Sequence, residues 1–216
     1  MKLYVTDLSP NSRRVLGAVH HLGLEGETEI QKFNLMAGEH QTDEFRAINP
    51  NVKVPVLVDG DLTLWEANPI VIYLSDRKGA ESFCPSAPRD RIEILRWQSW
   101  EVQHFNKALG DIVWETVAKQ FFGLGAPDAE KIEAGQQNFR RFAAVLEDQL
   151  ANQDYVLGNN VTAADFAVGS HSALALHPHS EVPLSEFPKV EAWLHRLEAL
   201  PAWAKTAPEK PAEAAE

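Results

Sequence analysis

Three polar residues, Ser9, Asn11 and Ser12, follow a short alternating run at the start of the chain. Their hydroxyl and amide groups can donate hydrogen bonds to an anion. Ser9-Pro10 is typical of a helix start, and a helix N-terminus also favours negative charge. From the residues alone, an ordinary helix cap at Ser9 explains the same pattern.

A second set of residues that could bind a charged ligand consists of His40, Lys53 and Glu66. Lys53 and Glu66 flank a predicted hairpin, in which Asp59-Gly60 separates two β-rich runs, 54–58 and 61–64. A single histidine or lysine is usually a solvated surface residue, so these residue types alone do not assign a binding role.

Histidine pairs occur twice, but their spacing is not that of a metal site. No cysteine accompanies them, and we expect no bound metal. The only cysteine is Cys84, which cannot form an internal disulfide and fits a reducing, cytoplasmic setting. The pairs are His20 with His21, and His177 with His179.

The net charge of −11 argues against nucleic-acid binding, because an acidic body repels phosphate. The hydrophobic fraction of 44% is typical of a globular protein. No apolar run is long enough to span a bilayer, so we expect no membrane partner.

The predicted secondary structure that positions these residues changes along the chain, from mixed strands and helices to helices alone. The first part predicts a strand, a helix, a weaker strand, a loop over 35–51, the hairpin and a closing helix over 66–74. This order suggests one mixed sheet with helices. A Gly/Ser/Pro-rich linker at 79–88 follows. The later predicted helices cover 89–117, 128–150, 162–176 and 187–200.

Two features refine the helical part. Thr162 and Asp165 have the spacing of a capping box, with Asp in place of the usual Glu. The tail, 207–216, is rich in Pro, Ala and Glu and is expected to be disordered.

The segments 38–50 (GEHQTDEFRAINP) and 53–67 (KVPVLVDGDLTLWEA) resemble the cytosolic glutathione transferases, and are most similar to the phi and theta classes. The resemblance implies a thioredoxin-like, glutathione-binding domain over 1–78 and, after the linker, an all-helical domain over 89–206. It also implies a cytoplasmic detoxification enzyme that forms a homodimer.

In this family the co-substrate glutathione is activated as a thiolate that attacks an electrophile. The resemblance assigns Ser9 as the hydroxyl that hydrogen-bonds the sulfur, with Asn11 and Ser12 as rivals. Omega-type relatives carry a cysteine in this loop. The serine here therefore disfavours thiol–disulfide chemistry.

The resemblance also implies a glutathione cradle. Val54-Pro55 corresponds to a cis-proline step whose backbone binds the cysteinyl amide. His40 and Lys53 approach the glycyl carboxylate. Glu66 pairs with the γ-glutamyl ammonium group.

The main departure from the family is Ala67, which occupies the position of a serine whose hydroxyl binds the γ-glutamyl carboxylate. The lost bond to a charged group is worth roughly 1.5–3 kcal/mol. The backbone N–H of Ala67 still opens a helix, where anions bind well.

The resemblance places a pocket for a small hydrophobic electrophile between the domains. The residues expected to line it are Leu8, Trp100, His104, Trp114, Phe121 and Phe122.

The sequence is compatible with three functions. The first is glutathione conjugation, favoured by Ser9, His40, Lys53 and Glu66. The second is a transferase-like binding protein with little or no catalysis, favoured by Ala67. The third is a stress-linked or translation-associated interaction module on the same fold.

Overall fold

The computed structural model describes residues 1–207 and divides them into two compact units. Among the described residues, the first unit holds 1–78 and 201–207, and the second holds Gly79–Leu200. The sequence had placed 201–206 with the helical domain. These residues instead pack on the first unit. The predicted disordered tail, apart from Ala207, lies outside the described residues.

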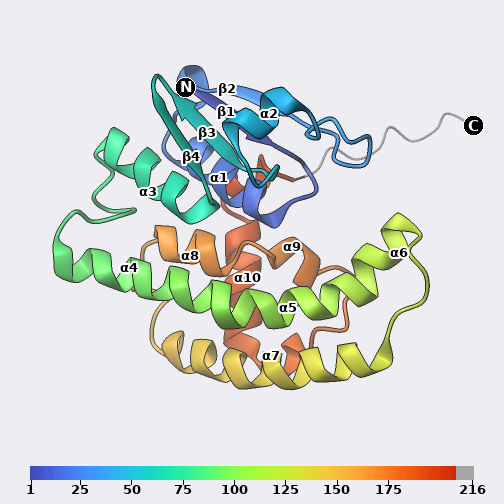
Figure 1. The fold of residues 1–216 in the computed structure, drawn as a ribbon. Coiled ribbons are helices and arrows are strands. Elements are labelled where there is room, and N and C mark those ends of the chain that lie inside the picture. The colour runs from blue at the N-terminus through green and yellow to red at the C-terminus, as the bar shows by residue number, and fades with distance from the viewer. Residues whose placement is uncertain (208–216) are drawn as a thin grey trace, which may run out of the picture. The chain divides into compact units, whose positions relative to one another are not determined.

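The first unit is built on a four-stranded mixed sheet in the order β2-β1-β3-β4 (Figure 1). β1 is parallel to β2 and antiparallel to β3, and β3 is antiparallel to β4. The predicted hairpin is confirmed: Asp59 pairs with Leu62, and Gly60 in the turn has a φ of 62°. The strands are β1 (Lys2–Val5), β2 (Glu29–Lys32), β3 (Val56–Asp59) and β4 (Leu62–Trp65).

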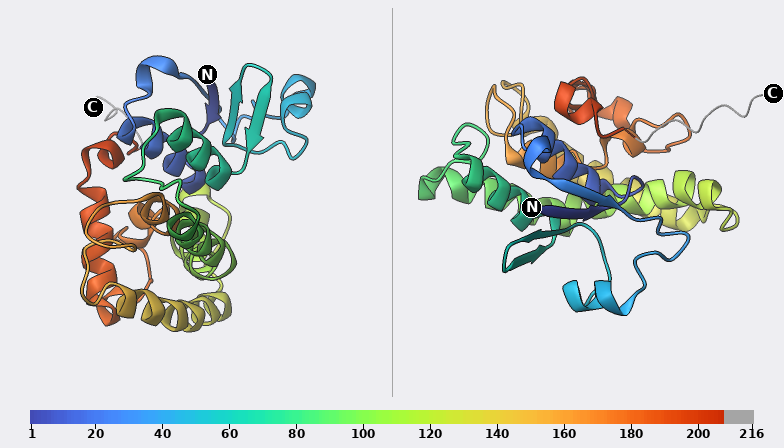
Figure 2. Two further views of the ribbon diagram at one scale, coloured as in Figure 1. Left: turned by 90° about the vertical axis from the view of Figure 1, so that its left-hand side faces the viewer. Right: turned by 90° about the horizontal axis from the view of Figure 1, so that it is seen from above.

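Helices α1 and α3 pack against one another, and α11 packs on α1. Figure 2 shows α2 set apart from α1 and α3, across the sheet. The far end of α3 is tied to the hairpin, because Tyr73 Oη and Arg77 Nη1 both donate to Asp59 Oδ2, at 2.6 and 2.9 Å. The helices of this unit are α1 (Pro10–His21), η1 (Glu25–Glu27), α2 (Asp43–Ile48), α3 (Ala67–Lys78) and α11 (Pro201–Ala204).

The expectation of a loop over 35–51 is wrong in part, because α2 forms within it. Thr42 caps this helix, its Oγ1 accepting a bond from Phe45 N at 3.1 Å. Phe45 is buried and packs on Tyr4 and Phe33, with ring centroids 5.4 and 4.8 Å away. The tertiary contact of one aromatic ring thus stabilises a helix too short to be predicted.

The second unit is helical throughout. The predicted helix over 89–117 extends to 122, and two π-helical segments interrupt its α-helical geometry. The elements are α4 (Pro88–Trp100), η2 (Glu101–Phe105), α5 (Asn106–Val113), η3 (Trp114–Ala118), α6 (Lys119–Phe122), α7 (Ala129–Gln149), α8 (Ala163–Val168), α9 (Ser172–Ala175), η4 (Leu184–Glu186) and α10 (Pro188–Glu198).

The predicted capping box is confirmed at the start of α8. The Asp165 side chain is fully buried and accepts bonds from Val156 N, Thr162 N, Thr162 Oγ1 and Trp193 Nε1, at 2.8–3.0 Å. Burial raises the pKa of the Asp165 carboxyl, while the four donors favour its charged form. One carboxylate thus joins α8, the loop before it and α10.

We expect Asp165→Ala to lower the free energy of unfolding by about 3 kcal/mol or more, because several buried donors lose their acceptor. Urea unfolding followed by circular dichroism measures this loss. Asp148→Ala, on the exposed face of α7, is the control and should change stability by less than about 0.5 kcal/mol. Equal losses in the two variants would contradict the assignment.

Candidate functional site

The strand ends that adjoin the polar residues singled out in the first unit lie at one edge of the sheet. Tyr4 pairs with Val56, and Val56 with Trp65, so the carboxyl ends of β1 and β4 lie beside the amino end of β3. β2 is parallel to β1, and its carboxyl end reaches the same edge. Ser9, His40, Lys53 and Glu66 all follow or precede these strand ends, although they are far apart in sequence.

Ser9 is the N-cap of α1, and its Oγ accepts a bond from Ser12 N at 3.3 Å. A hydroxyl has one proton and two lone pairs, so this cap leaves the Ser9 proton available to a further acceptor. The side chain is half-buried at the positive end of a twelve-residue helix. Capping and anion stabilisation are therefore compatible roles for this residue.

The two rival residues are placed differently. Ser12 is fully buried, and its Oγ accepts a bond from Thr6 N at 3.2 Å, which ties α1 to the end of β1. Asn11 is exposed on the first turn of α1. The hydroxyl of Ser12 thus serves the fold, whereas Ser9 and Asn11 remain accessible.

The backbone on either side of the hairpin has unusual conformations. The Val54-Pro55 peptide is cis, as the family resemblance implied. Glu66 has a φ of +75°, rare for a residue with a side chain and frequent at functional sites. Its side chain is exposed, and the following Ala67, only 5% exposed, begins α3.

Backbone N–H groups at the start of α3 come before the first hydrogen bond of that helix. The first helical bond there runs from Ile70 N to Glu66 O at 3.3 Å, and Pro69 has no N–H. The N–H of Ala67 therefore lies at the end of a helix, where anions bind well.

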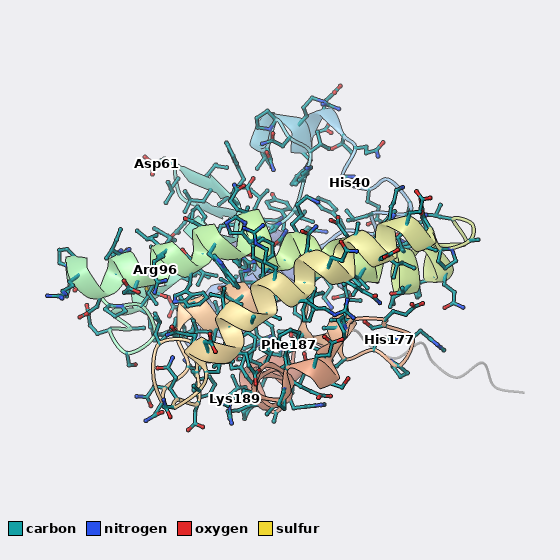
Figure 3. All side chains as sticks on the ribbon, turned by 90° about the horizontal axis from the view of Figure 1, so that it is seen from below. His40, Asp61, Arg96, His177, Phe187 and Lys189 are labelled. Atoms are coloured by element: carbon teal, nitrogen blue, oxygen red, sulfur yellow. The ribbon has the colours of Figure 1, made fainter. Side chains whose placement is uncertain are left out.

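His40 and Lys53 complete the set. Figure 3 shows His40 on the connection between β2 and α2. Its Nδ1 is buried and has no hydrogen-bond partner among the described residues. The Lys53 side chain is exposed, and its carbonyl accepts a bond from Asn49 Nδ2 at 2.7 Å, which holds the chain in place before the cis peptide.

Sequence reasoning missed two buried arginines on α1. Arg14 donates to Asn68 Oδ1 and so links α1 to the first turn of α3, next to Ala67. Arg13 donates through Nε to Thr206 Oγ1 at 2.9 Å. The doublet Arg13-Arg14 within an apolar helix pattern was the available signal, but it does not reveal these partners.

A hollow of about 450 Å³ in the first unit is lined in part by residues 6–8, which precede Ser9 in the chain. Leu8, a predicted pocket residue, lines it with Phe33 and Leu35. An ion pair between Lys32 and Asp7, 2.9 Å apart, borders it. Its walls are thus both apolar and charged.

The other predicted pocket residues belong to the second unit, where they have different surroundings. Trp100 and His104 join an aromatic cluster with Phe142, whose ring lies 4.8 Å from that of His104. Trp114 is 46% exposed and lines a separate hollow beside α7. Phe121, 70% exposed, contacts Phe122 at the end of α6.

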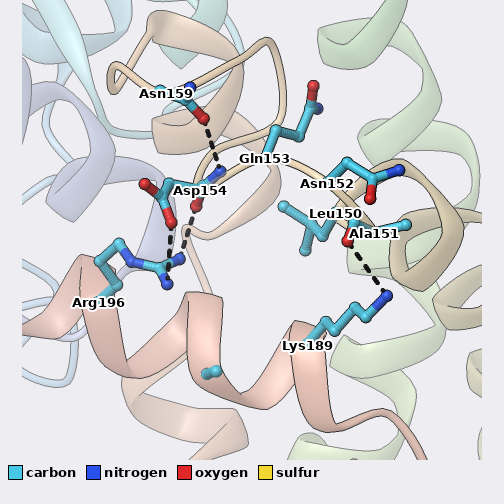
Figure 4. Close-up of a pocket in the computed structure, with 9 residues that line it drawn as sticks. Leu150, Ala151, Asn152, Gln153, Asp154, Asn159, Lys189 and Arg196 are labelled. Carbon is cyan, nitrogen blue, oxygen red and sulfur yellow. Dashed lines mark hydrogen bonds and ion pairs between the residues drawn. The ribbon is translucent and has the colours of Figure 1, made fainter.

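A polar hollow of about 420 Å³ lies between the loop after α7 and α10 (Figure 4). Its charged groups bind the loop itself: Arg196 Nη1 donates to Asp154 O at 2.6 Å, and Lys189 Nζ to Ala151 O at 3.4 Å. The two cationic side chains therefore hold the loop in place.

The histidine pairs do not form part of a larger ligand set. His20 Nδ1 lies 3.0 Å from Glu25 Oε1, and the rings of His177 and His179 lie 5.4 Å apart on the loop after α9. Within residues 1–207 no three His, Cys, Asp or Glu side chains are grouped to hold a metal ion. None of the helices described is long and apolar enough to cross a membrane.

Known proteins match this chain over both of its units. Family models for the glutathione S-transferase N-terminal and C-terminal domains match residues 8–77 and 105–201. Glutathione S-transferase 3 of Zea mays is 31% identical, over 95% of this chain and 92% of its own length. Glutathione S-transferase 1 of Schizosaccharomyces pombe is also 31% identical, over 89% of both.

A solved structure has the same fold over nearly the whole chain. It is the theta-class glutathione S-transferase of Xanthomonas axonopodis pv. citri with glutathione bound, 27% identical, with a TM-score of 0.82 over 97% of both chains. The sheet with its cis Val54-Pro55 step, the helical second unit and these matches lead to one conclusion. The chain belongs to the glutathione S-transferase family, is a glutathione transferase, and has the family's thioredoxin-like and helical domains.

Proposed function

We propose that this transferase binds glutathione at the sheet edge of the first unit and activates its thiol as a thiolate through Ser9. The observation that carries the proposal is the cap geometry, in which Ser9 Oγ accepts from Ser12 N and keeps its proton for the sulfur. A free thiol has a pKa of about 8.5, so each unit of depression takes about 1.4 kcal/mol of preferential thiolate stabilisation. The Ser9 hydroxyl and the N-terminus of α1 together supply this stabilisation of the thiolate.

The tripeptide is held along its length in this proposal. The backbone of Val54 pairs with the cysteinyl amide as an added strand would. Glu66 binds the γ-glutamyl ammonium group, and the N–H of Ala67 binds the carboxylate. His40 and Lys53 bind the glycyl carboxylate at the other end. The exposed carboxylate of Glu66 and the unpartnered Nδ1 of His40 support these roles.

The activated sulfur then attacks an electrophilic carbon of a small hydrophobic substrate. The new carbon–sulfur bond forms as the leaving group departs with its electron pair. Leu8 and its hollow are on the same loop as Ser9 and would contact that substrate. This conjugation is the chemistry of a detoxification enzyme.

Calorimetric titration with glutathione, followed by conjugation to a chloro-nitrobenzene, tests the proposal. We expect binding at millimolar glutathione or below and measurable turnover. We expect Glu66→Gln to weaken binding about tenfold, because it loses one charge-assisted bond. Glu44→Gln, on the exposed face of α2, is the matched control. The absence of both heat and turnover would contradict the proposal.

Ala67 favours a second candidate, a binding protein without catalysis. Such a protein would release heat with glutathione but would not turn over the electrophile. The same two measurements therefore separate the two candidates.

We also propose that the chain forms a homodimer, in which the first unit of one subunit contacts the second unit of the other. Exposed apolar side chains support this: Trp65 on β4, and Ile92, Leu95 and Val102 along α4 and η2. Such patches mark interaction surfaces. Light scattering should give twice the chain mass of 24.1 kDa.

The surface assignment has its own test. We expect Ile92→Glu to shift the mass toward that of a monomer. Val145→Glu, at a comparably exposed apolar residue on α7, should leave the dimer intact. A monomeric wild-type protein would contradict the dimer.

A further inference from the structure

The segment 201–206, here called the return segment, packs against α1 within the first unit. Its Trp203 is fully buried, and the guanidinium carbon of Arg13 lies 4.9 Å from the centre of that ring. This is the geometry of a cation–π contact. Arg13 is itself only 7% exposed, so the contact is shielded from solvent.

A chain of hydrogen bonds reinforces the contact. Arg13 Nε donates to Thr206 Oγ1 at 2.9 Å, and Thr206 Oγ1 donates to Trp203 O at 2.6 Å. Both the planar face and the Nε edge of the guanidinium are therefore engaged by the return segment. A lysine could not reproduce this arrangement.

Arg13 also belongs to the first turn of α1. Its backbone N–H donates to Ser9 O at 2.9 Å. The same turn is held on another side by Ser12, whose Oγ accepts from Thr6 N. Two anchors, one to β1 and one to the return segment, thus fix the turn that presents the Ser9 hydroxyl.

We propose that the return segment is a positioning element for thiol activation, and that Arg13 and Thr206 are positioning residues that act through Ser9. The inference rests on the proposed role of Ser9. A hydrogen bond to the sulfur weakens steeply with distance and angle, so loss of one anchor would reduce thiolate stabilisation.

A second contact of the return segment provides an internal control. Lys205 Nζ lies 3.3 Å from Glu25 Oε1, which is also bonded to His20 in the last turn of α1. These bonds lower the pKa of Glu25 to about 2, so this contact persists across the pH range of an assay. It lies at the opposite end of α1 from Ser9.

The experiment measures the pKa of the thiol of bound glutathione by ultraviolet titration of its thiolate. Thr206→Val keeps the side-chain volume and removes the acceptor for Arg13. Arg13→Lys keeps the charge and removes the planar contacts. We expect each change to raise the pKa of the bound thiol by about 0.5–1 unit, a roughly 3- to 10-fold loss of thiolate near neutral pH.

Further readouts exclude a merely structural effect. KM for glutathione should change less than twofold, and Lys205→Met should leave the pKa of the thiol unchanged. Hydrogen exchange of the Ser12 and Arg13 amides should accelerate in Thr206→Val, whose matched volume preserves the fold.

The outcomes separate the two proposals. A lowered pKa of the thiol in the wild type that persists in Thr206→Val and Arg13→Lys would overturn this inference and leave the role of Ser9 intact. A bound thiol that already has the pKa of free glutathione in the wild type would overturn the role of Ser9, and this inference with it.

Discussion

Replacing Ser9 with alanine is expected to lower kcat/KM for conjugation roughly 10- to 150-fold, the effect of losing a hydrogen bond to a charged group worth about 1.5–3 kcal/mol. The loss of activity comes from the missing hydroxyl proton, which would bond the sulfur. The hydroxyl oxygen accepts from Ser12 N and serves the helix cap. The loss should appear mainly in kcat, and the pH profile should shift to higher pH. Steady-state kinetics with varied glutathione measures both.

Because Ser9 also caps α1, its alanine variant should lose about 1 kcal/mol of stability. Ser9→Gly separates the two effects, since glycine at an N-cap costs only a few tenths of a kcal/mol. We expect the glycine variant to be as inactive as the alanine variant but more stable. Ser9→Thr should retain activity. Full activity in Ser9→Gly would transfer the role to Asn11.

Replacing Ala67 with serine is expected to tighten glutathione binding at least tenfold, because a hydroxyl bond to the γ-glutamyl carboxylate is worth about 1.5–3 kcal/mol. Ala67 is the first residue of α3. The added oxygen would act on the same carboxylate as the backbone N–H of residue 67. Calorimetric titration of both proteins measures the gain.

The matched control is Ala129→Ser, which makes the same substitution at the first residue of α7 in the second unit. It should leave glutathione affinity unchanged. If Ala67→Ser also bound no more tightly than the wild type, the γ-glutamyl carboxylate would not lie at the start of α3. The proposed glutathione contacts from His40 to Glu66 would then be wrong at the γ-glutamyl end.

Local features of the sequence predicted well. The hairpin at Asp59-Gly60, the cap at Ser9 and the box formed by Thr162 and Asp165 depend on neighbours within a few residues, and the structure has all three. The cis peptide at Pro55 came from the family resemblance instead. Each of these features is encoded by a short segment. They could be predicted because tertiary contacts do not override the local preference.

Features that depend on distant partners were not predictable. Charged residues are usually exposed, yet Arg13 and Arg14 are buried, because Thr206 and Asn68 supply acceptors from other parts of the chain. The π-helical turns of η2 and η3 lie in an otherwise regular helical pattern and carry no residue signature. The short helix α2 depends on the packing of Phe45.

The placement of the return segment in the first unit has a consequence for synthesis of the protein on the ribosome. The face of α1 around Arg13 cannot be covered until Trp203 has been translated, after the whole of the second unit, Gly79–Leu200. At roughly 5–20 residues per second, the intervening residues take about 6–24 seconds to appear. The domain made first is thus completed last, and the nascent chain exposes the binding face for Trp203 throughout that interval.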